Sequence, residues 1–234
     1  MILEEIEPEP LEKINLPDVI SSCNYNSMKY FILGENKTEN NQLLKNIVSQ
    51  LANEQKIDEI AFFSNSLVNI TFPNLPMSLF RKYDIFILHV AIQHQQQAMK
   101  RNSSHTLALI FNDIVREEDC KNGTFEYVIA NARFFNTHVI FITSFPLYLN
   151  KSLKSRFDYL FIFPGERKTG DYRKNAFNYY ASDLSINYDT FIGYLDKLKR
   201  GEYLVNMRAY MLSFQKYHKK ITANLPALLE LRFL

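Results

Sequence analysis

The chain has 234 residues, of which 47% are hydrophobic and 22% are charged, and its formal net charge at pH 7 is +2. This composition excludes an intrinsically disordered chain, and the length suits one domain that can bury a full core. The net charge is too small to require a nucleic-acid partner or to exclude one.

Cysteine usage and apolar runs place the chain among soluble proteins. The two cysteines, Cys23 and Cys120, form no disulfide framework, so a reducing compartment is the default. The acidic, proline-bearing N-terminus is typical of neither a signal peptide nor a transit peptide. The longest apolar runs, near 85–92 and 138–149, are too short or too interrupted to span a bilayer. We therefore expect no membrane insertion, and any association with a membrane or virion would come through partners.

Hydrophobic patterning predicts strands that alternate with helices. The predicted strands are 28–33, 59–64, 106–111, 138–143 and 158–163. Helices are expected after residue 41 and over 84–101, 124–135, 167–181 and 188–200, with a short basic helix within 146–157. Such alternation predicts an α/β fold with a mostly parallel central sheet and helices on both faces.

The remaining segments are predicted from weaker patterns. Residues 1–27 form an irregular N-terminal arm, and 65–76 form a loop because two prolines interrupt them. The pair 202–207 and 211–218 is expected to be a hairpin. The main domain therefore spans 28–218, and 219–234 are left as a C-terminal tail.

The strand, loop and helix over 28–51 have the layout of a phosphate-binding loop. In the motif GxxxxGK[ST], backbone N–H groups cradle phosphate, the lysine meets the outer phosphates and the hydroxyl takes magnesium. Counted from Gly34, the last three motif positions fall on Glu39, Asn40 and Asn41. The second glycine, the lysine and the hydroxyl are missing. A carboxylate at Glu39 would repel a polyphosphate unless it turned outward.

Polar residues follow two further strands, where ligands of such sheets bind. Asn112 and Asp113 end the 106–111 strand, the position of the acids that hold magnesium and polarise water in NTPases. Asparagine is a weaker ligand for a hard cation. Ser144 follows the 138–143 strand, where NTPases often carry a sensor of the γ-phosphate. A plain strand-to-loop turn is the simpler explanation of these residue types, which are common there.

Basic residues offer phosphate-binding or subunit-bridging groups. The candidates are Arg133, Lys151, Lys154 and Arg156, with Lys37 inside the loop. An arginine finger would supply charge across a subunit interface, whereas a solvated basic surface is the simpler explanation. The histidines and cysteines have no metal-ligand spacing, so no metal site is predicted.

Several stretches together resemble the genome-packaging ATPases of large DNA viruses, the poxvirus-like members of the FtsK–HerA branch. They are YFILGENKTENNQLL, HTLALIFNDI, ANARFFNTHVIFITSFPLYLNKSLKSRFDYLFIF and EYLVNMRAYMLSFQKY. The third is the most specific, whereas the first two match the nucleotide motifs only in shape. The resemblance implies a P-loop NTPase (RecA-like) three-layer fold over most of the chain.

Residue by residue, the resemblance places the family's chemistry on a degenerate set of side chains. The motif lysine falls on Asn40 and the hydroxyl on Asn41, while the magnesium acid falls on Asn112. The second acid falls on Asp113 and the finger-like arginine corresponds to Arg156. The degenerate nucleotide-binding set is then Gly34, Lys37, Thr38, Asn40, Asn41, Asn112 and Ser144.

Three functional hypotheses follow. The first is an inactive packaging-ATPase homologue, with no cofactor, that serves in virion assembly, virion structure or DNA handling. The second is an active packaging ATPase that uses ATP and magnesium through Lys37, Asp113 and Arg156. The third is an unrelated α/β protein. The resemblance implies self-association or pairing with a homologous ATPase, contact with viral DNA or other virion proteins, and a place in the host cytoplasm (viral factory) or the virion.

Overall fold

The computed structural model describes residues 13–14, 16–17, 27–54, 56–65, 70–72, 74–165, 170–182, 186–207 and 229–231. Its centre is a nine-stranded sheet in the order β1-β9-β8-β7-β2-β6-β5-β3-β4. All neighbouring strands run parallel except the two pairs that β8 makes, with β7 and with β9. The strands are β1 Lys13–Ile14, β2 Lys29–Leu33, β3 Glu59–Ser64, β4 Met77–Phe80, β5 Leu107–Asn112, β6 Thr137–Thr143, β7 Tyr159–Ile162, β8 Tyr203–Met207 and β9 Leu229–Leu231.

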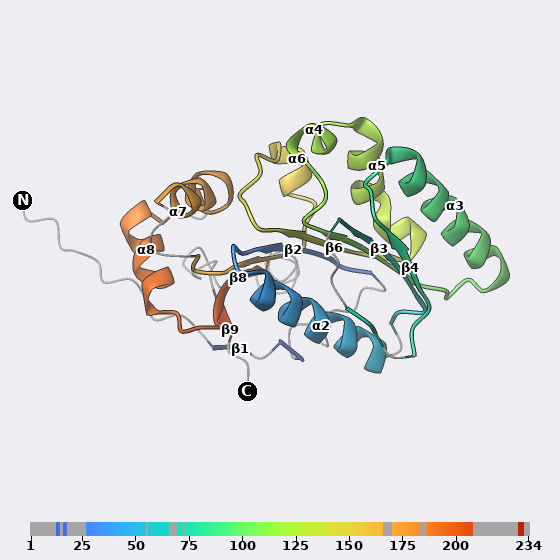
Figure 1. Ribbon diagram of the computed structural model, residues 1–234, viewed down its shortest axis with the longest axis horizontal. Coiled ribbons are helices and arrows are strands. Elements are labelled where there is room, and N and C mark those ends of the chain that lie inside the picture. The colour runs from blue at the N-terminus through green and yellow to red at the C-terminus, as the bar shows by residue number, and fades with distance from the viewer. Residues whose placement is uncertain are drawn as a thin grey trace, which may run out of the picture.

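Helices cover both faces of this sheet, unequally (Figure 1). One face carries α2, and the other carries α3, α5, α6 and α7. The helices are α2 Lys37–Asn53, α3 Ile85–Arg101, α4 Glu117–Cys120, α5 Gly123–Asn131, α6 Lys151–Lys154, α7 Gly170–Ala176 and α8 Tyr188–Lys197. A 3-10 turn, η1 Ala132–Phe135, follows α5, and a π-helical turn, η2 Phe177–Ala181, follows α7.

Side-chain alternation along the strands divides the core in two. In β2, Phe31 and Leu33 face α5 to α7, whereas Tyr30 and Ile32 face α2. All five residues of β2 and all six of β5 are buried, as expected for strands covered on both faces. The α/β three-layer fold with a mostly parallel sheet is therefore confirmed.

The predicted strands and the long helix 84–101 are confirmed within one or two residues. The resemblance also predicts that the 28–33 and 106–111 strands are adjacent or one strand apart, since the two nucleotide motifs must converge, and this one relation is confirmed. β6 separates β2 from β5, so the carboxyl ends of these strands lie on the same edge of the sheet.

The hairpin prediction is not matched by the pairing of β8. This strand pairs with β7 and with β9, a segment for which the sequence carries no clear pattern. The proposed second arm, 211–218, lies outside the described residues. β4 follows the predicted loop 65–76 and was not predicted from the sequence. The strand is short, and its residues are partly exposed and mixed in polarity. The predicted helix 188–200 ends at Lys197, three residues early.

A buried histidine holds the amino ends of two segments. His138 Nδ1 accepts the Met28 N–H at 3.1 Å, so the other ring nitrogen, Nε2, donates to the Lys56 carbonyl at 3.1 Å. The side chain is fully buried. Burial lowers the pKa of His138 from 6.5 to about 4, and the neighbouring Lys56 charge adds to this effect.

This pKa predicts an acid-sensitive contribution to stability. Between pH 6.5 and 4 the unfolded chain binds a proton at His138 that the folded chain does not. The contribution of neutral His138 to the free energy of unfolding is therefore fully present above about pH 6.5. It falls by up to about 3 kcal/mol as the pH approaches 4. Urea unfolding at pH 7 and pH 4.5 measures the effect. A His138→Gln variant, which cannot titrate, should show a shallower pH dependence; an unchanged dependence contradicts the assignment.

Candidate functional site

The turn between β2 and α2 is short and is closed by its own side chain. Only Gly34, Glu35 and Asn36 separate the strand from the helix. Asn36 caps the helix: its Oδ1 accepts the N–H of Thr38 at 2.9 Å and that of Glu39 at 3.4 Å. Free N–H groups at a helix N-terminus are what a phosphate binds. Here an amide oxygen of the protein already takes two of them.

Asn40 fills the space beneath Gly34. Its side chain is 2% exposed, and its Nδ2 donates to the Gly34 carbonyl at 2.5 Å. A Cβ added to Gly34 would overlap Asn40 Oδ1 and lie 2.8 Å from Cδ2 of Phe163. Close packing thus requires glycine at position 34. Asn40, which aligns with the motif lysine, is a buried amide held in place by its hydrogen bond to Gly34.

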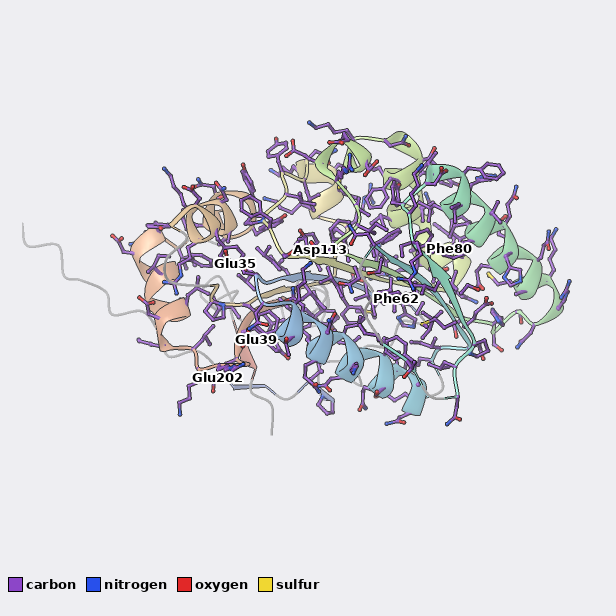
Figure 2. The ribbon with its side chains drawn as sticks, in the orientation of Figure 1. Glu35, Glu39, Phe62, Phe80, Asp113 and Glu202 are labelled. Carbon is purple, nitrogen blue, oxygen red and sulfur yellow. The ribbon has the colours of Figure 1, made fainter. Side chains whose placement is uncertain are left out.

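Glu39 does not face the turn. Its Oε1 accepts the Gly201 N–H at 3.2 Å and lies 4.0 Å from Arg200 Nε, so the carboxylate binds the segment between α8 and β8. Figure 2 labels Glu39 at the start of α2 and Asp113 beside the sheet. Repulsion of a polyphosphate by Glu39, expected if it faced the site, is therefore reduced by its turn toward Gly201.

Asp113, Ser144 and Lys37 come together at the carboxyl ends of β5 and β6. The Asp113 carboxylate accepts the Ser144 N–H at 3.0 Å and the Ser144 hydroxyl at 2.5 Å. Lys37 Nζ, on the first residue of α2, lies 3.5 Å from Asp113 Oδ2. Asp113 adopts φ +54°, a left-handed conformation that Asp tolerates better than most residues. The group is an ion pair with an attached hydroxyl, partly open to solvent.

Two amides occupy the neighbouring positions. Asn112 is 6% exposed, and its Nδ2 donates to Asn41 Oδ1 at 3.4 Å. These residues align with the motif hydroxyl and the magnesium acid, so the structure brings the two positions together but provides only neutral groups. Thr38, one turn earlier, is exposed and contributes its N–H to the Asn36 cap.

Apart from Lys37, the basic candidates described below lie elsewhere. Arg156 is exposed and acts electrostatically on Lys29, at the amino end of β2. Since Gly34 lies five residues beyond Lys29 along the strand direction, this end lies roughly 16 Å from Gly34. Arg133 pairs with Asp158 at the same end, and Lys154 donates to the Tyr179 carbonyl. Arg156 therefore does not reach Asp113 within its own chain.

Sequence reasoning missed the structural roles of Asn36 and Tyr172 in this region. Asn36 and Glu39 have the spacing of a helix N-cap and its third residue, a signal that the polar run concealed. Tyr172, fully buried, places its hydroxyl 3.2 Å from the Leu33 carbonyl and 3.1 Å from the Phe163 carbonyl. Burial raises the pKa of Tyr172 far above its usual value, and Glu35 reinforces the shift. This phenol joins the ends of β2 and β7, and no local pattern indicates it.

The architecture is the P-loop NTPase fold: a mostly parallel sheet between helix layers, with a strand, turn and helix at its centre. No family model and no curated protein matches the sequence. Solved structures do match. The genome packaging NTPase B204 of Sulfolobus turreted icosahedral virus 2, in complex with ATP-gammaS, superposes with a TM-score of 0.59 at 13% identity, over 79% of this chain and 94% of that chain.

Two further structures agree with this result. The DNA-packaging ATPase B204 of Sulfolobus turreted icosahedral virus gives a TM-score of 0.58 at 15% identity, over 80% of this chain and 95% of that chain. The AMPPCP complex of the virus 2 protein gives 0.57 at 14% identity, over 79% and 94%. At such identities the similarity establishes the fold and not the activity. Among the described residues, no helix is long and apolar enough to cross a membrane.

Proposed function

We propose that this protein is a non-catalytic relative of the viral genome-packaging ATPases, of the FtsK–HerA type, that serves in virion assembly, virion structure or DNA handling. The shared fold with the packaging NTPases supports the packaging-related part of the proposal. The chemistry of the strand ends supports loss of catalysis, because ATP hydrolysis needs phosphate binding and metal binding at the same edge of the sheet.

The observation that carries the proposal is closure of the β2–α2 turn by Asn36 and Asn40. Asn36 takes two helix N–H groups that a phosphate needs, and Asn40 replaces a lysine with a buried amide. Asn41 and Asn112 offer magnesium no carboxylate. The residues present at these motif positions therefore do not fit ATP with magnesium, and we propose that neither is a resident cofactor.

An active packaging ATPase is the second candidate, and one observation favours it. Lys37 and Asp113 form an ion pair 3.5 Å apart, and the Ser144 hydroxyl binds the same carboxylate. A cation, an acid and a polar group thus meet where hydrolysis would occur. In this alternative Arg156 would have to come from another subunit, since its own chain places it at the far end of β2.

Nucleotide binding and hydrolysis by the purified protein, with and without DNA, separate the two candidates. Absence of both supports the non-catalytic proposal. Turnover that depends on Asp113 establishes the alternative.

Assembly is a further part of the proposal. A relative that has lost catalysis can keep its subunit surfaces, so we expect self-association or association with an active homologous ATPase, within the virion or the host cytoplasm. Light scattering at high protein concentration and pull-down from infected cells measure this. A strict monomer with no partner argues against it.

A further inference from the structure

A group of charged side chains lies at the amino ends of β2 and β7, away from the site described above. We call Lys29, Arg133, Arg156 and Asp158 the amino-end cluster. Lys29 begins β2, and Asp158 immediately precedes β7. Arg133 comes from η1, and Arg156 follows α6. Three separate segments thus bring their charges to one end of the sheet, since Arg156 and Asp158 share the connection between α6 and β7.

Asp158 is the centre of this cluster, and both of its carboxylate oxygens are occupied. Arg133 Nη2 donates to Oδ1 at 2.6 Å, and the backbone N–H of Lys29 donates to Oδ2 at 2.9 Å. In return, the Asp158 N–H donates to the Lys29 carbonyl at 2.8 Å. These bonds fix the position of the carboxylate.

Positive charge in the cluster exceeds negative charge by two. Lys29, Arg133 and Arg156 supply three cations against the single carboxylate of Asp158. Asp158 attracts the Lys29 ammonium as well as the Arg133 guanidinium, so one carboxylate serves more than one cation of the cluster. Arg156 is exposed, so its guanidinium can meet a molecule that arrives from solvent.

The positive charge of Lys29 lies in an unusually buried position. Its side chain is on the helix-rich face of the sheet, with Phe31, and the residue is only 5% exposed. Burial lowers its pKa, Asp158 opposes that effect, and the two arginines lower it further. A bound anion would remove this unfavourable crowding of cations, and attraction is stronger at a partly buried position than in water.

We propose that the amino-end cluster binds a phosphate group that carries two negative charges, with Arg156 as its exposed contact and Lys29 as its buried one. A phosphate dianion matches the excess of two positive charges. The planar arginine side chain can donate two parallel hydrogen bonds to such a group. The proposal is independent of the proposed function, because the cluster is separated from Gly34 by the length of β2.

Titration of the full chain with inorganic phosphate at pH 7.5 and low salt, followed by calorimetry, tests the proposal, and glycerol phosphate distinguishes a free ion from a small phosphate ester. We expect one saturable site for at least one of these ligands. An Arg156→Gln variant should raise Kd about tenfold. Arg101→Gln, which removes an exposed arginine at the end of α3, is the matched control and should leave Kd unchanged.

A second readout keeps the test independent of the variant's folding. Acetylation of Lys29 by a neutral acylating reagent, followed by mass spectrometry, should slow when phosphate is bound because the anion stabilises the ammonium form. Acetylation of Lys100, exposed on α3, should not change. The proposal is overturned if no saturable phosphate binding is found. It is also overturned if phosphate binds but Arg156→Gln leaves Kd unchanged and phosphate leaves the rate of Lys29 acetylation unchanged. Binding of single-stranded DNA through Arg156 without phosphate binding also overturns it, in favour of a diester backbone.

Discussion

The purified protein is expected to hydrolyse ATP far more slowly than the roughly 1 s⁻¹ usual for enzymes, with or without DNA. Removal of a single preorganised charge-stabilising group can cost about a factor of 10²–10³ in rate. Here Asn40 replaces the lysine and Asn112 replaces the metal-binding acid, while Asn36 occupies the helix N–H groups. Neighbouring groups would have to take over both phosphate binding and metal binding, and this would require a different conformation of the β2–α2 turn.

A coupled phosphate-release assay measures this turnover, and Asp113→Ala is the diagnostic variant. If the protein is non-catalytic, this substitution should leave the background rate of phosphate release unchanged, although it removes the carboxylate that binds Ser144 and Lys37. Turnover near 1 s⁻¹ that Asp113→Ala abolishes would show that the active alternative is correct. A Lys37→Gln variant then distinguishes a catalytic lysine from a simple ion-pair partner.

Restoration of the motif gives a reciprocal test. A variant with Glu39→Gly, Asn40→Lys, Asn41→Thr and Asn112→Asp should recover some nucleotide binding if an ancestral site persists. The Asn36 cap limits that recovery, because its oxygen still occupies the N–H groups of residues 38 and 39. Addition of Asn36→Gly should therefore increase nucleotide affinity further. Equal affinity with and without that substitution would show that the cap does not block the turn.

Much of the fold could be predicted from the sequence because its central strands are short, mostly hydrophobic segments that are followed by polar residues. β5 and β6 are buried along their whole length and have apolar residues at their centres, and Asn112, Asp113 and Ser144 mark where the two strands end. β4 and β9 could not be predicted in the same way. β4 is a short edge strand with mixed burial, and β9 is a three-residue segment whose pairing with β8 depends on the tertiary fold.

The site was predictable only in part, for a related reason. The carboxyl ends of parallel strands lie on one edge of the sheet, which places Asp113 and Ser144 at the same edge. Their contact also requires β5 and β6 to be neighbours, an order that the sequence does not give. Loop length, by contrast, depends on where a helix begins. The sequence alignment with a phosphate-binding loop placed residues 39–41 at its end, whereas the Asn36 cap begins α2 at Lys37. Side-chain closure of the turn is a consequence of that earlier start.

Replacement of Gly34 by alanine is expected to lower the free energy of unfolding by about 1–3 kcal/mol, as for other insertions into a packed core. The new methyl group would overlap Asn40 Oδ1 and lie 2.8 Å from Phe163 Cδ2. The Gly34 backbone cannot move away easily, because its N–H donates to the Thr143 carbonyl at 3.1 Å and its own carbonyl binds Asn40. Urea unfolding at pH 7 measures the loss. Gly193→Ala is the matched control: nothing lies within 4 Å of a Cβ there, inside α8, so it should stabilise by up to about 1 kcal/mol.

A double-mutant cycle with Asn40→Ala identifies the source of that loss. Asn40→Ala alone should cost about 1–3 kcal/mol through the lost bond to the Gly34 carbonyl. Because it also removes the atom that the alanine methyl would overlap, Gly34→Ala should cost less in its presence, with a coupling of about 1 kcal/mol. Contact with Phe163 persists, so the rescue is incomplete. If the two effects simply add, or if Gly34→Ala is as harmless as Gly193→Ala, then Asn40 does not fill the turn, and nucleotide exclusion must depend on the Asn36 cap alone.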